Sequence, residues 1–172
     1  ALTEYLLEVI RAWGKIGSVD CFYMTEDWGT QTSLMISPEM WRRFFADRYR
    51  RICDQAHALG MDVYFHSCGH VTPIIGDLID AGIDVIDPLQ PEAMDLGFVA
   101  REFGGKVAFA GGISDQAIAG YTPQQVRDEV RRTIELLGTR FNNAYIVTPS
   151  NVMPPDIPFE NLVALFEACH ET

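Results

Sequence analysis

Basic side chains are scarce in this chain. Its 172 residues include 13 Lys and Arg against 24 Asp and Glu, which gives a formal net charge of -11 at pH 7. A nucleic-acid site needs an excess of Lys and Arg on one face, because phosphate contacts supply much of its affinity. The sequence therefore predicts no nucleic-acid partner.

Disulfide frameworks, signal segments and long apolar runs are missing as well. The four cysteines, Cys21, Cys53, Cys68 and Cys169, have no paired spacing. The N-terminus lacks a basic segment followed by an apolar signal core, and no apolar run is long enough to cross a bilayer. We therefore expect a cytoplasmic protein without a membrane partner. Its length and its 48% hydrophobic content predict one domain with an ordinary core.

Short apolar runs alternate with longer amphipathic segments, a pattern typical of repeated βα units and a parallel sheet. We expect strands near Val19–Met24, Asp62–His66, Asp84–Ile86, Val107–Ala110 and Ala144–Val147. Cap residues, prolines and glycines place helices at Leu2–Trp13, Ser37–Gly60, Thr72–Gly82, Pro91–Gly104, Thr122–Gly138 and Pro158–His170.

Each expected strand ends in a polar or glycine-rich cluster. Barrel enzymes collect their chemistry from several strand ends, whereas an open doubly wound sheet concentrates it at one switch point. Composition alone leaves both architectures open, and the spread of polar clusters favours the barrel. A full barrel takes about 250 residues and eight strands. The sequence thus predicts an α/β fold of about five parallel strands with flanking helices, a partial (β/α)8 TIM barrel.

One strand end carries two good ligands for a soft metal. The apolar run Val63–Phe65 stops at His66, and Cys68 follows two residues later. Side chains two apart on a strand point the same way, so His66 and Cys68 should aim at one point. Imidazole and thiolate are preferred zinc ligands. The alternative is a hydrogen-bonded histidine beside a small buried thiol.

Other strand-end residues are candidates for acid–base work or substrate contact. Asp27, Asp87 and Asp115 could act as general acids or bases, because apolar surroundings raise a carboxyl pKa, or could only set turn geometry. Trp28 could stack on a flat ligand or seal the end of the sheet. Gly112, in a Gly-Gly pair, could expose backbone amides to a ligand or permit a close backbone approach.

Taken together, the strand-end motifs resemble the uroporphyrinogen decarboxylase superfamily, which includes methyltransferases that pass methyl groups to and from corrinoid proteins. The motifs are Glu26–Gln31, Ile36–Trp41, Phe65–Gly69, Asp87–Ala93, Gly111–Gln116 and Pro154–Asn161. The resemblance implies a single (β/α)8 barrel about twice this length, of which these residues form the C-terminal portion.

The zinc-dependent methyltransferases of that superfamily use a His-x-Cys pair, which His66 and Cys68 match, and a further cysteine after the last strand. Asn151 stands near that place here. Asparagine oxygen is a weak zinc ligand, so a third strong ligand must come from elsewhere or the site is loose; Glu26 is our first candidate and Asp27 our second. The resemblance also implies a corrinoid carried by a partner protein. Among the other strand-end residues, the expected catalytic residues are Asp27, Asp115 and Asn151, and the expected substrate contacts are Trp28, Gln90 and Gly112.

Two other functions stay open at this point. A uroporphyrinogen decarboxylase of tetrapyrrole (heme) biosynthesis needs no cofactor, but it needs positive groups for its polyanionic substrate, and these are few at the strand ends. A non-catalytic binding or assembly fragment would explain the missing third cysteine. A partial barrel leaves two exposed edges, so we also expect a homo-oligomer formed through them.

Overall fold

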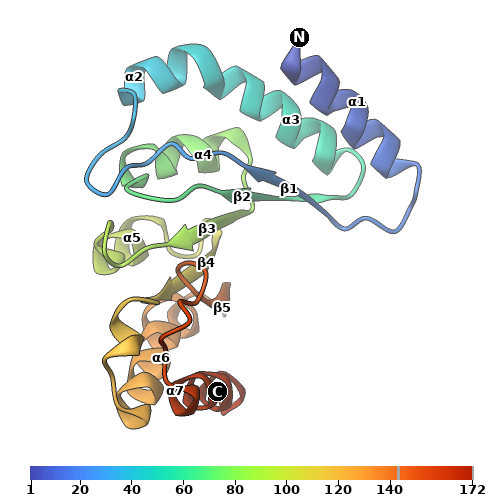
Figure 1. Ribbon diagram of the computed structural model, residues 1–172. Coiled ribbons are helices and arrows are strands. Elements are labelled where there is room, and N and C mark those ends of the chain that lie inside the picture. The colour runs from blue at the N-terminus through green and yellow to red at the C-terminus, as the bar shows by residue number, and fades with distance from the viewer. Residues whose placement is uncertain (143, 172) are drawn as a thin grey trace. The chain divides into compact units, whose positions relative to one another are not determined.

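The computed structural model describes residues 1–142 and 144–171. The chain divides into two compact units, Ala1–Ile86 and Asp87–Thr172. The single domain that the length predicts stays a prediction. The fold is α/β, as predicted, with parallel strands and flanking helices (Figure 1). The sheet order is β1 (Cys21–Thr25), β2 (Asp62–His66), β3 (Val85–Leu89), β4 (Ala108–Ile113) and β5 (Tyr145–Pro149).

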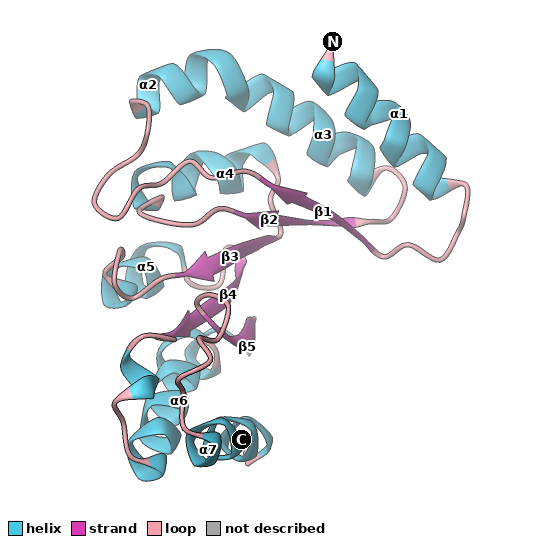
Figure 2. Ribbon diagram, viewed as in Figure 1, coloured by secondary structure: helices cyan, strands magenta, loops and turns pink. Residues whose placement is uncertain are grey.

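Helices precede, connect and follow these strands (Figure 2). Their bounds are α1 (Leu2–Gly14), α2 (Pro38–Trp41), α3 (Asp47–His57), α4 (Ile75–Ala81), α5 (Leu96–Phe103), α6 (Pro123–Leu137) and α7 (Phe159–His170). Short 3₁₀ turns occupy Thr72–Ile74, Ala117–Ala119 and Thr139–Phe141. No helix in the described part of the chain combines the length and apolarity needed to span a membrane.

In the first unit, helices cover one face of the β1–β2 pair. The two strands run in parallel register from Cys21 opposite Asp62 to Thr25 opposite His66. Phe22 and Met24 are buried, whereas the intervening Tyr23 is half exposed. This alternation arises because successive side chains of a strand point to opposite faces. Helices α1 and α3 lie together over the buried face (Figure 1).

A π-helical segment, Arg42–Ala46, interrupts the long helix between β1 and β2. The helix begins as predicted, because the Ser37 side chain accepts a hydrogen bond from the Met40 N–H and Pro38 takes the first helical position. Trp41 before the π-helical segment and Tyr49 after it are both buried, with ring centroids 5.1 Å apart. The sequence pattern did not predict this interruption.

In the second unit, α6 packs against β4 and β5, and α7 packs against α6. Thr122 and Gln125 form a capping box at the start of α6, at the predicted Thr-Pro boundary. The core consists of buried aliphatic side chains from β4, the turn after it and both helices. These are Ile113, Ile118, Val126, Val130, Ile157, Ala164, Leu165 and Ala168.

One helix start was predicted wrongly. Helix α5 begins at Leu96 instead of Pro91, because Asp95 is the N-cap and its carboxylate accepts the Phe98 N–H at 2.9 Å. The preceding residues form a turn. Strands β3 and β4 also continue beyond their predicted ends and include Leu89 and Ile113.

Candidate metal site

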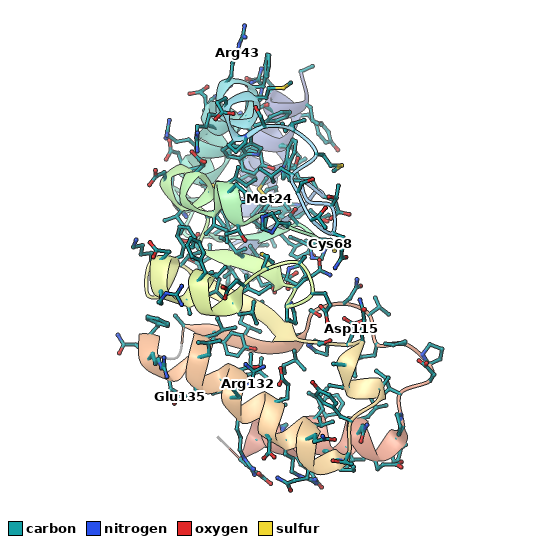
Figure 3. All side chains as sticks on the ribbon, turned by 90° about the vertical axis from the view of Figure 1, so that its left-hand side faces the viewer. Met24, Arg43, Cys68, Asp115, Arg132 and Glu135 are labelled. Atoms are coloured by element: carbon teal, nitrogen blue, oxygen red, sulfur yellow. The ribbon has the colours of Figure 1, made fainter. Side chains whose placement is uncertain are left out.

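Strand β2 ends at the paired ligands that the sequence singled out. His66 is the last residue of β2 and Cys68 lies in the loop after it, where Figure 3 labels it. Both side chains are half-buried. Cys68 Sγ lies 3.5 Å from His66 Nε2. The two donor atoms therefore converge, as expected for residues two apart at a strand end.

Backbone and side-chain hydrogen bonds fasten the loop after β1 to this loop. The Trp28 N–H donates to Ser67 Oγ at 2.9 Å, and the His70 N–H donates to the Thr30 carbonyl at 2.7 Å. Between them, the Cys68 N–H donates to Asp27 Oδ1 at 2.9 Å. These contacts hold the Asp27 carboxylate beside Cys68.

Two glycines allow the loops to approach this closely. A Cβ at Gly29 would lie 2.6 Å from the Cys68 carbonyl oxygen and the His70 nitrogen. A Cβ at Gly69 would lie 2.5 Å from the Gly29 backbone, and Gly69 also has a φ of +82°. Only residues without a side chain fit this contact.

The resulting donor set fits a zinc ion. Ligand atoms of Asp27, His66 and Cys68 all lie within 4.8 Å of one another. Zinc bound at about 2.3 Å to sulfur and about 2.0 Å to nitrogen in tetrahedral geometry places those two atoms about 3.5 Å apart. The observed separation of 3.5 Å agrees with that requirement. A carboxylate completes a set that zinc accepts.

Glu26, the first candidate for the third ligand, has a different environment. It is not part of the three-residue group; its carboxyl instead accepts a hydrogen bond from Tyr49. Tyr49 also accepts the Trp28 indole N–H at 2.8 Å. Burial raises the pKa of Glu26, and the Tyr49 hydrogen bond partly opposes that shift. Of the two expected carboxylates, Asp27 is therefore the one beside His66 and Cys68.

Polar side chains also gather at the strand ends of the second unit. Asp115, after β4, is buried, and its Oδ1 accepts a hydrogen bond from the buried Ser150 hydroxyl at 2.9 Å. Gln90, after β3, donates to the Ser150 carbonyl at 3.5 Å. The structure thus joins Asp115 and Gln90, two expected site residues, through one serine.

Sequence reasoning missed three members of this polar network. Besides Ser150, Ser114 donates a hydrogen bond to Glu92 and accepts the Ala117 N–H at 2.9 Å. Ser114 and Ser150 directly follow β4 and β5, and Glu92 lies three residues beyond β3, so their position near strand ends was the available signal. Serine is common in turns, where it bonds the local backbone, and this makes the signal unspecific.

Three of the remaining expected site residues are Asn151, Gly112 and Trp28. The exposed Asn151 accepts its neighbour's N–H, that of Val152, at 2.7 Å. Gly112 is buried, and a Cβ there would meet side chains of α6. Trp28 packs edge-on against Phe45, with ring centroids 4.5 Å apart, so it joins the β1 loop to the long helix.

Comparisons with known proteins address the fold and the family. A methyltransferase from Methanosarcina mazei has a similar structure, with a TM-score of 0.72 and 19% sequence identity. The match covers 98% of this chain and 47% of that protein, so the chain spans about half of its length. None of the curated proteins matches the chain. Residues 1–172 match the family described as uroporphyrinogen decarboxylase (URO-D). The chain therefore belongs to the uroporphyrinogen decarboxylase family.

Proposed function

We propose that this chain is part of a zinc-dependent methyltransferase that passes a methyl group to or from a corrinoid carried by a partner protein. The convergence of Cys68 Sγ and His66 Nε2 at 3.5 Å, with Asp27 beside them, carries the proposal. The structural likeness to a methyltransferase supports the choice of branch within the family.

The proposed ligands are His66, Cys68 and Asp27. A Zn²⁺ ion held there supplies Lewis acidity, which favours deprotonation of a bound thiol or polarises an ether or amine substrate. One thiolate and one carboxylate balance the charge of the ion. Three protein ligands leave a coordination position for substrate, as in catalytic rather than structural zinc sites.

The surrounding residues have a positioning role in this proposal. The Cys68 N–H engages one oxygen of Asp27, which leaves the second oxygen for the metal. Ser67, which is buried, holds the Trp28 backbone and so fixes the loop that carries Asp27. Such outer contacts orient ligands, and their loss typically lowers metal affinity 10- to 100-fold.

Zinc titration of the purified chain tests the proposal. We expect one zinc per chain in competition with a chromophoric chelator, and loss of binding in His66→Ala and Cys68→Ser. Asp27→Asn should weaken binding at least about tenfold. Glu26→Gln, which changes the adjacent carboxylate, should bind zinc like the parent because Glu26 lies outside the donor group.

Two results would contradict this assignment. Metal-free chain that takes up no added zinc would remove the basis for a metal-dependent methyltransferase. Saturable binding of a porphyrin, followed by its absorbance, together with unchanged zinc affinity in His66→Ala, would favour the decarboxylase instead. Sedimentation velocity would test the proposed homo-oligomer, since a monomer at all concentrations contradicts it.

A further inference from the structure

An apolar cavity of about 480 Å³ lies beside the long helix of the first unit. Its walls are Trp28, Ile36, Met40, Phe44, Phe45 and Arg48. Three of these residues are aromatic, two are aliphatic or thioether side chains, and one is a guanidinium. No acidic side chain lines the cavity. Its size is within the range of small-molecule sites.

The π-helical segment supplies two of the aromatic walls. Phe44 and Phe45 both belong to Arg42–Ala46, and π-helical turns occur frequently at functional sites. Phe45 meets the Trp28 ring edge-on at 4.5 Å. Trp28 is itself held by its N–H bond to Tyr49, so this wall is fixed. Met40 and Phe44, by contrast, are 49% and 43% exposed at the opening.

The charges around the cavity are unusual for so acidic a chain. Five of the 13 basic residues lie within residues 42–51. Arg42 pairs with Asp77 through two bonds, and Arg51 pairs with Glu4. Arg43, which projects outward in Figure 3, lies over the Phe44 ring at 5.1 Å.

Arg48 is the charged residue of the cavity wall. One of its N–H groups donates to the Phe44 carbonyl, and among the described residues no carboxylate pairs with Arg48 or Arg43. A guanidinium has five N–H donors, so most of those of Arg48 remain for a ligand. A planar carboxylate matches its fork geometry.

We infer that this cavity binds a flat aromatic anion, with its rings against the wall formed by Trp28, Phe44 and Phe45 and its acidic group on Arg48. Aromatic walls favour a planar ligand through stacked and edge-on contacts. The single unpaired cation in an apolar wall selects a negative charge. The site shares no residue with the Asp27, His66 and Cys68 group, so it stands independently of the proposed function.

Calorimetric titration of the full chain with a matched pair of probes tests the inference. The pair is 2-naphthoate and its neutral analogue 2-naphthalenemethanol, which have the same rings. We expect saturable one-to-one binding of the anion, at least about tenfold tighter than the alcohol, because charge-assisted hydrogen bonds are the stronger kind. Equal affinities, or no saturable binding, would overturn the inference.

Two arginines of the same helix give a matched pair of variants. Arg48→Met should remove the preference for the anion, whereas Arg50→Met, which changes the net charge equally outside the cavity, should keep it. Met40→Glu places a carboxylate at the opening and should weaken anion binding without affecting the alcohol. Circular dichroism checks that each variant is folded. Equal losses in Arg48→Met and Arg50→Met would refute a specific site.

Discussion

Gly29→Ala tests whether the close contact of the two loops holds the proposed metal ligands. The new Cβ would lie 2.6 Å from backbone atoms of Cys68, Gly69 and His70, none of which can rotate away. Ordinary contact begins at 3.4 Å, so the loops must separate by about 0.8 Å. That displacement exceeds the tolerance of about 0.5 Å for a functional constellation.

The same displacement stretches the hydrogen bonds between the loops. The Cys68 N–H to Asp27 bond at 2.9 Å and the His70 N–H to Thr30 bond at 2.7 Å would both lengthen. With a typical cost for overpacking of about 1–3 kcal/mol, we expect the free energy of unfolding to fall by about 2 kcal/mol. Zinc affinity should fall at least about tenfold.

Urea unfolding and competitive zinc titration measure the two effects. Gly17→Ala is the control, because Gly17 has a φ of +72° and a Cβ there would meet nothing within 4 Å. It should cost about 1 kcal/mol through backbone strain and leave zinc affinity unchanged. Parental zinc affinity in Gly29→Ala, or an equal loss in Gly17→Ala, would refute the reasoning.

Three further outcomes are expected. Burial raises the pKa of the Glu26 carboxyl above its usual 4.5 in the folded chain. The stability that protonated Glu26 contributes is therefore complete below pH 4.5 and is lost as the pH rises through the folded pKa. In urea unfolding, the free energy of unfolding of Glu26→Gln should fall less over that pH range than that of the parent. Asn161→Ala should lower the free energy of unfolding by about 2–3 kcal/mol, because two carbonyls lose their bonds to the buried amide at 2.7 Å. Thiol labelling of the native chain should modify the exposed Cys21 well before Cys53, since burial raises the pKa of the Cys53 thiol to about 12.

Local sequence signals predicted much of the fold. The Ser37-Pro38 and Thr122-Pro123 pairs located two helix starts, because a capping side chain and a proline act within one turn of backbone. The prediction of a helix start at Pro91 was wrong. A proline is compatible with a helix start but does not require one, and the side chain of Asp95 decided the boundary.

The third member of the candidate metal site needed tertiary information. Glu26 and Asp27 are adjacent carboxylates just beyond β1, and which of them meets His66 depends on how the chain leaves the strand. The structure resolves this through Tyr49, which engages Glu26, and through the Cys68 N–H, which engages Asp27. Both partners are distant in sequence, so no local pattern distinguishes the two residues.

The π-helical segment also sets the phase of the helix that contains it. Trp41 and Tyr49 are eight residues apart, and in a regular α-helix of 3.6 residues per turn they would differ by about 80° around the axis. The wider π turn advances less per residue and brings both rings to the same buried side. Deleting one residue from this segment would leave Trp41 and Tyr49 seven residues apart, which is close to two turns of a regular α-helix. The two rings would then stay on the same side of an uninterrupted α-helix, but the wide turn that contains Phe44 and Phe45 would be lost.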